Sequence, residues 1–191
     1  MSARRMFSRA MVAALGAAAL AVAPVGAPVG AQAIGQTPQA RAVLPGIEGA
    51  ILLDTMALPF KVRGNRDSIF TALETVFKEL KLPVESRNAK SALLNNLNAD
   101  ISRRLGDVAL SRYLDCGRGF SGSNADFYRI TLAFSVWVEP ATGEPQQLMV
   151  AIAASGRDPA GSRSAYSQCT SRGALEKRIA DRVQELVGTP R

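Results

Sequence analysis

The sequence predicts a single α+β domain in which two helices cover one face of a largely antiparallel sheet of four to five strands. Apolar side chains recur at helical spacing in residues 65–82 and again in residues 171–187. Between these segments, residues 125–140 alternate apolar and polar side chains, which is typical of a half-buried strand. We therefore expect the order strand, helix, several strands, helix, within a domain that spans residues 50–188.

The first 33 residues are predicted to be an export signal rather than part of the domain. Three arginines and no acidic residue precede an apolar run at residues 10–23. Pro and Gly interrupt that run before it reaches the about 20 apolar residues that a membrane-spanning helix needs. Residues 31–33, Ala-Gln-Ala, place small side chains where signal peptidase accepts them. We expect cleavage of residues 1–33, no transmembrane segment in the mature chain, and a soluble periplasmic or secreted protein.

The charge of the chain excludes one class of partner. The whole sequence has 23 Lys and Arg against 16 Asp and Glu, a net charge of +7. Loss of residues 1–33 removes three arginines and leaves +4, which is 20 basic minus 16 acidic residues. The arginines are dispersed, whereas nucleic-acid binding needs a concentrated basic stripe. We expect no nucleic-acid partner, and instead an envelope protein, a lipid or an anionic glycan.

The first half of the domain contains one strand and one helix. Residues 34–49 are rich in Pro, Gly, Gln and Ala without a period, which predicts a flexible lead-in. The apolar run 51–58 ends at Pro59 and predicts a buried strand. A helix follows over residues 65–82, with Asn65 or Asp67 as its N-cap and Pro83 after its end. Its apolar stripe is Ile69, Phe70, Leu73, Val76, Phe77 and Leu80.

The second half of the domain supplies the remaining sheet and the last helix. Residues 84–104 predict two strands, and residues 125–140 the central strand. Leu148, Val150 and Ile152 share one face of a strand that forms a hairpin with the central one. After a loop, the helix over 171–187 buries Leu175, Ile179, Val183 and Leu186. Since the helices cover only one face, Arg129, Thr131 and Ser135 should line a polar, solvent-facing side.

The two cysteines, Cys116 and Cys169, are predicted to form a structural disulfide. An exported chain meets an oxidising compartment, where paired thiols form disulfides. Cys116 precedes the central strand and Cys169 precedes the last helix, so we expect the bond to tie the sheet to that helix. A catalytic cysteine needs a base, and the chain contains no histidine. Two isolated cysteines also cannot supply the four ligands of a zinc site.

The absence of histidine narrows the chemistry further, because Ser-His-Asp hydrolysis and most catalytic metal sites require it. We expect no catalytic residues, no metal and no cofactor. Asp100, Asp107 and Asp115 could form the carboxylate pair of a glycan-acting enzyme only if two of them converge. Solvated loop acids are the simpler interpretation.

A possible binding surface consists of aromatic and arginine side chains near the central strand. Phe127 and Trp137 interrupt its polar face beside Arg129, and together they could contact a partner protein or a sugar ring. Alternatively, the lead-in or a neighbouring strand covers the two aromatic residues. Four arginines, Arg103, Arg104, Arg112 and Arg118, could converge on an anion, and we include Arg112 and Arg118 in the possible surface. Scattered, solvated arginines are the simpler interpretation.

Two resemblances support this layout. The motif LSRYLDCG at residues 110–117, followed by an alternating strand and a second cysteine before the last helix, resembles uncharacterised exported bacterial proteins over residues 50–187. More distantly, residues 58–86, LPFKVRGNRDSIFTALETVFKELKLPVES, resemble the start of the helix-grip domains in the C component of the β-barrel assembly machinery, an outer-membrane lipoprotein. This resemblance implies a helix-grip-like fold. The chain differs in having one such domain and no cysteine placed for lipidation.

These observations favour an exported, non-enzymatic module that binds or scaffolds another molecule. One alternative is a carrier that holds a small apolar ligand or lipid between its helices and its sheet, as helix-grip domains can. The other alternative is the carboxylate-dependent glycan-acting enzyme.

Overall fold

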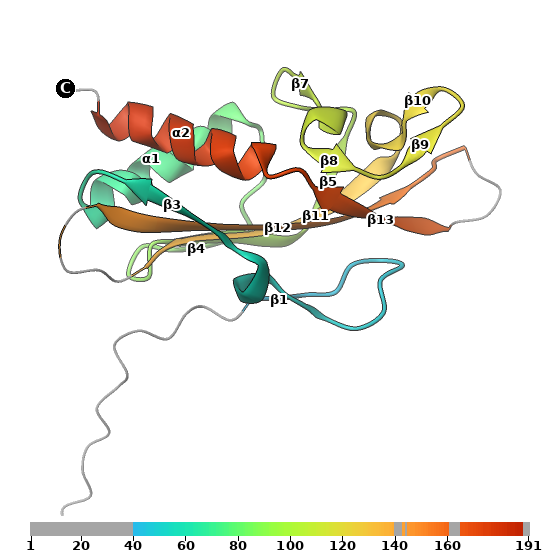
Figure 1. The fold of residues 1–191 in the computed structure, drawn as a ribbon. Coiled ribbons are helices and arrows are strands. Elements are labelled where there is room, and N and C mark those ends of the chain that lie inside the picture. Colours follow the sequence, from blue (N-terminus) through green and yellow to red (C-terminus); the bar gives the residue numbers. More distant parts are fainter. Residues whose placement is uncertain (1–39, 140–142, 144, 161–164, 189–191) are drawn as a thin grey trace, which may run out of the picture. The chain divides into compact units, whose positions relative to one another are not determined.

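The computed structural model describes residues 40–139, 143, 145–160 and 165–188. The predicted signal peptide and the first part of the lead-in lie outside these residues. The described chain has the predicted α+β fold, with two helices packed on one face of an antiparallel sheet (Figure 1). The sheet has seven strands and is therefore larger than the four to five expected.

The sheet is ordered β4-β5-β11-β12-β13-β8, and β3 pairs with the first half of β12. Its strands are β3 (Leu58–Val62), β4 (Ser86–Asn88), β5 (Leu93–Ser102), β8 (Leu114–Asp115), β11 (Arg129–Val138), β12 (Gln146–Arg157) and β13 (Tyr166–Ser171). The predicted hairpin is the centre of the sheet, where Phe134 of β11 lies opposite Ile152 of β12. Strand β13 was not predicted, because its residues 166–171 are mostly polar.

The two helices begin and end close to the predicted residues. Helix α1 (Arg66–Glu79) has Asn65 as its N-cap, and the Asn65 side chain accepts a hydrogen bond from the Ser68 backbone N–H at 2.8 Å. Helix α2 (Ala174–Gly188) includes Gly188, which we expected beyond its end. Both helices bury their apolar stripes against the sheet. The ring centroids of Phe77 in α1 and Phe134 in β11 are 5.0 Å apart.

The other face of the sheet is largely covered as well, contrary to the prediction of a polar, solvent-facing side. Of the three residues predicted to line it, Thr131 and Ser135 are buried and Arg129 is exposed. Residues 40–57, here called the cover segment, lie across it. They contain β1 (Arg41–Ala42), β2 (Ile51–Leu52) and the 3-10 helix η1 (Leu53–Met56). The predicted strand over 51–58 is thus only partly a strand, and residues 40–49 are not a free flexible lead-in.

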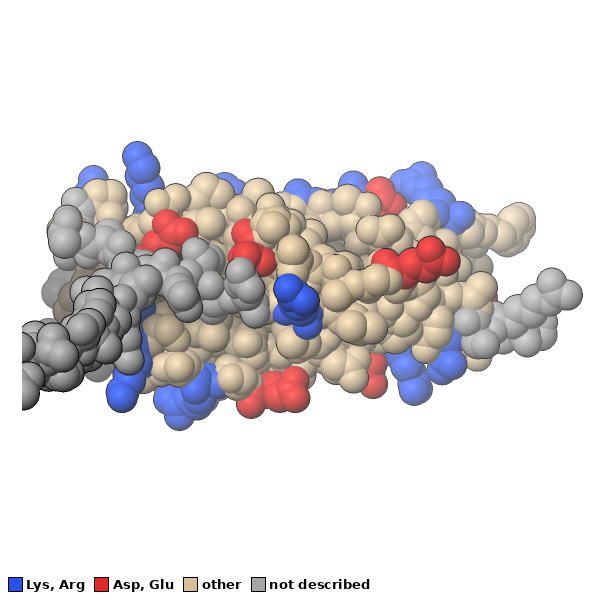
Figure 2. Space-filling view, turned by 90° about the horizontal axis from the view of Figure 1, so that it is seen from below, with Lys and Arg blue, Asp and Glu red and all other residues tan. Residues whose placement is uncertain are grey.

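Apolar contacts hold the cover segment on the sheet. Ala42, Leu44 and Leu53 are buried against Trp137 and its neighbours on β11 and β12. Thr131 and Ser135 are small enough to be buried beneath the segment, which is why their polarity did not indicate exposure. Seen from this side, the described surface consists largely of uncharged residues, with acidic and basic residues scattered over it and along its margins (Figure 2).

A third region, residues 103–128, connects β5 to β11 and is here called the cystine segment. It consists of short elements: β6 (Arg104–Leu105), β7 (Val108–Ala109), η2 (Leu110–Arg112), β8, β9 (Arg118–Gly119), β10 (Gly122–Ser123) and η3 (Asn124–Asp126). Leu105, Leu110 and Ala125 are buried in the same core as the helices. The cystine segment therefore extends the layer that covers the helical face of the sheet.

Candidate functional site

The cystine segment is covalently attached to the sheet by the predicted disulfide. Cys116 and Cys169 are bonded, with their Cα atoms 4.2 Å apart, and both are buried. Cys169 lies in β13, which pairs with β8 just before Cys116. The bond thus joins the cystine segment to a strand, whereas we expected it to join the sheet to the last helix.

Polar contacts around the disulfide hold the same segment in place. Asp115 forms an ion pair with Arg172 at 2.9 Å, across the junction of β8 and β13. Within the segment, the Ser111 N–H donates to the Asp126 carboxylate at 2.9 Å. The side-chain amide of Asn124 donates to the backbone oxygen of Cys116 at 3.2 Å. Because these contacts connect residues distant along the chain, they fix the shape of a region with little regular secondary structure.

The most exposed apolar side chain of the described residues lies on this anchored segment. Phe120 is fully exposed, and Phe127 is 53% exposed. Phe120 lies in the turn between β9 and β10, where Gly119 pairs with Gly122. Gly122 has φ +121°, and a Cβ placed on it would lie 3.8 Å from the Phe127 ring. The tight turn therefore directs Phe120 into solvent and leaves Phe127 beside the hairpin.

The residues predicted to form a binding surface lie in different environments. Four of them are exposed, and the fifth, Trp137, is buried. Arg112, Arg118 and Phe127 are exposed on the cystine segment, as the binding hypothesis requires. Arg129 lies at the start of β11, where it lines a hollow of about 240 Å³ with Asp100 and other β5 residues. They therefore do not all form one surface.

Trp137 does not belong to any exposed surface, so its assignment to the binding site is wrong. It is only 2% exposed and packs beneath the cover segment. This is the alternative in which the lead-in covers the aromatic residue. The alternating sequence pattern could not distinguish an exposed Trp137 from a covered one, because such a pattern shows which side chains share a face of the strand and not what lies over that face.

Phe120 was missed, although the sequence contains a signal for it. The motif Gly119-Phe-Ser-Gly122 places two residues between glycines, which is typical of a tight hairpin turn. Side chains at such a turn project away from any core. An aromatic residue there gains nothing for folding, and this would have distinguished Phe120 from the buried aromatic residues.

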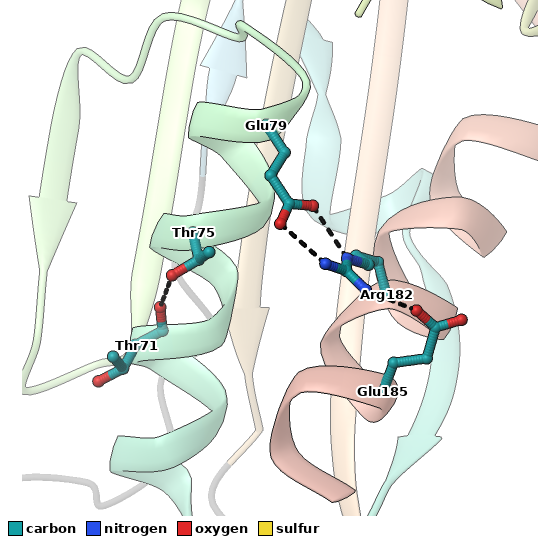
Figure 3. A network of polar contacts seen from close by, with 5 residues as sticks. All are labelled: Thr71, Thr75, Glu79, Arg182 and Glu185. Carbon is teal, nitrogen blue, oxygen red and sulfur yellow. Dashed lines mark hydrogen bonds and ion pairs between the residues drawn. The ribbon is translucent and has the colours of Figure 1, made fainter. Parts of the chain in front are cut away.

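A second concave region lies on the outside of the helix pair, with a volume of about 490 Å³. Its charged side chains mainly pair with one another. Arg182 of α2 donates to both carboxylate oxygens of Glu79 in α1, each at 2.9 Å, and also contacts Glu185 (Figure 3). The Arg182 hydrogen bond lowers the pKa of Glu79, and the Glu79 carboxylate raises that of Arg182. These contacts link the two helices, so the charged residues of this concave region are explained by the packing of α1 on α2.

The carboxylates proposed for catalysis lie on separate elements. Asp100 is on β5, Asp107 follows β6, and Asp115 on β8 is paired with Arg172. Among the described residues, no group of three or more His, Cys, Asp or Glu side chains could hold a metal ion. Nothing in this arrangement brings two of the three acids to one groove.

Comparisons with known proteins give no family for this chain. No protein-family model matches the sequence, and a search of curated proteins found no match. In the part of the chain that the structure describes, no helix has the length and apolar character needed to cross a membrane.

Proposed function

We propose that the chain is an exported, non-enzymatic module of the bacterial envelope or secreted fraction that binds its partner through the cystine segment. The observation that supports this most is the exposure of Phe120 and Phe127 on a region held by a disulfide. Exposed aromatic side chains on anchored loops are common at binding surfaces. A surface that is already ordered also loses less conformational entropy on binding.

The other two functions have less support. A carrier needs space between helices and sheet, but buried side chains that include Leu73, Phe77 and Phe134 fill this interface. A glycan-acting enzyme needs two convergent acids, and the described aspartates in question lie on separate elements. The chain also has no histidine to serve as an alternative acid or base.

Site-specific photo-crosslinking in the bacterial host tests the binding proposal. A benzophenone amino acid replaces Phe120 in one variant and Val84 in a matched variant. Val84 is a suitable control because it is also apolar and partly exposed, at 38%, but precedes β4 at another edge of the sheet. We expect a defined adduct, with protein or lipid, from position 120 and none from position 84. Equal labelling at both positions, or none at position 120, would contradict the proposal.

A further inference from the structure

The hairpin formed by β9 and β10 exposes an apolar side chain at its turn. Phe120 is fully exposed at the turn, and the hollows described above are lined by other residues. A protruding phenylalanine is poorly suited to holding a small molecule, which requires a concave site. It is well suited to inserting into the apolar part of a membrane or into a pocket on another molecule.

The segment that carries this hairpin is basic. The cystine segment contains four arginines, all exposed, and none forms an ion pair with a described residue: Arg103, Arg104, Arg112 and Arg118. Of its three aspartates, Asp115 is neutralised by Arg172. The segment itself has a formal charge of +1, from four arginines minus three aspartates, and the charge is +2 when Arg172, the partner of Asp115, is counted with it. The guanidinium groups are available to an anionic partner.

We infer that this hairpin docks the protein on a bilayer containing anionic phospholipids. Phe120 enters the boundary between head groups and acyl chains, while Arg118 and its neighbours contact lipid phosphates. The inference rests on the proposed function, since it names the partner of the same surface. One exposed aromatic residue and a small positive charge produce reversible attachment.

The combination of groups favours a bilayer over other anionic partners. A free phosphate would use the arginines but leave Phe120 in water. A bilayer surface uses the apolar side chain and the positive charges together, and it requires no matching groove. A protein partner with an apolar pocket is the other candidate, and the experiment below separates the two.

Vesicle co-sedimentation with the mature exported protein tests the inference. Vesicles of phosphatidylcholine mixed with phosphatidylglycerol are compared with phosphatidylcholine alone, at low and high salt. We expect binding to the anionic vesicles that weakens as salt screens the arginines. Phe120→Ser should lower the partition coefficient about tenfold, and Arg118→Gln about fivefold. Equal binding to both kinds of vesicle, or to neither, overturns the inference.

Matched variants at another edge of the sheet control for general changes in polarity and charge. Val84→Ser removes a partly exposed apolar side chain, and Lys90→Gln removes an exposed positive charge in the β4–β5 turn. Both should bind vesicles within about twofold of the wild type. Lys90 lies in the turn that precedes β5, which is about 30 Å long and reaches the cystine segment only at its other end. Val84 precedes β4, which pairs with the first residues of β5. Unchanged emission from Trp137, the single tryptophan, verifies the fold of each variant.

The outcomes separate this inference from the proposal on which it rests. A protein adduct from position 120 without vesicle binding overturns the lipid inference and leaves the binding module standing. Vesicle binding that Phe120→Ser does not weaken also overturns it, because the hairpin would then not be the docking element. Vesicle binding that is lost in Phe120→Ser but kept in Val84→Ser supports it.

Discussion

At the scale of single residues, the disulfide between Cys116 and Cys169 should dominate stability. The bonded residues are 53 apart in the sequence, and closing a loop of that length stabilises the fold by about 4 kcal/mol in the chain-entropy model. The variant Cys116→Ser/Cys169→Ser should therefore unfold at a clearly lower urea concentration than the oxidised wild type. Wild-type protein treated with reductant is the matched control and should unfold close to the double variant. Coincident urea transitions for the oxidised protein and the double variant would contradict this prediction.

The same bond shows how far individual residues could be predicted. The cysteine pairing followed from their number and the inferred export, and it is confirmed. The elements that the bond connects could not be predicted, because β13 has too few apolar residues for the sequence to indicate a strand there. Phe127 was correctly chosen as an exposed aromatic residue, while Trp137 was not. The exposure of each aromatic side chain depends on whether a segment distant in the sequence lies over it. Local sequence patterns do not show this.

At the scale of elements, the sequence predicted those whose pattern is local. The α1 stripe, the α1 N-cap and the hairpin of β11 with β12 each depend on neighbours within a few residues or across one turn. The cover segment could not be predicted in the same way. Its strands are two residues long, and its apolar residues are buried only because the sheet offers a surface of small side chains, such as Ala133, Ala151 and Ala153. Tertiary packing therefore decides the structure of this segment.

The cover segment also gives a prediction at this scale, because it approaches β13 closely at one glycine. Gly46 has φ +76°, and a Cβ there would lie 2.2 Å from the Tyr166 Cβ of β13. Gly46→Val should therefore lift the segment from the sheet and admit water to Trp137. The expected result is red-shifted tryptophan emission and stronger quenching by acrylamide, which are unambiguous because Trp137 is the only tryptophan.

Gly49→Val is the matched control for this measurement. Gly49 also has a positive φ, +82°, but nothing lies within 4 Å of a Cβ placed on it. The two substitutions share the backbone strain, and only the first adds a clash with β13. If both variants shift the Trp137 emission equally, the close approach of Gly46 does not hold the cover segment.

At the scale of the whole molecule, both faces of the central sheet are used for stability. The helices and the cystine segment cover one face, and the cover segment covers the other. The residues that we propose for binding lie in a connection between strands, where an exposed aromatic side chain costs little stability. This division explains why the alternating pattern of the strands predicted the fold but not the proposed binding surface. It also explains why a disulfide lies beside the proposed binding surface, since a connection without long strands or helices needs another constraint.

The export of the chain is the prediction on which the whole interpretation depends. Signal cleavage after Ala33 leaves a mature protein that starts at Ile34, and an oxidising compartment allows the disulfide to form. Intact-mass spectrometry of protein recovered outside the cytoplasm, alkylated without reductant, should give the mass of residues 34–191 less two hydrogens. A Cys116→Ser variant is a useful control, because its remaining thiol must take up the alkylating reagent. Recovery of the full-length chain from the cytoplasm with both thiols alkylated would remove the reason for an oxidised structure, and the cystine segment would lose the constraint that makes it a plausible binding surface.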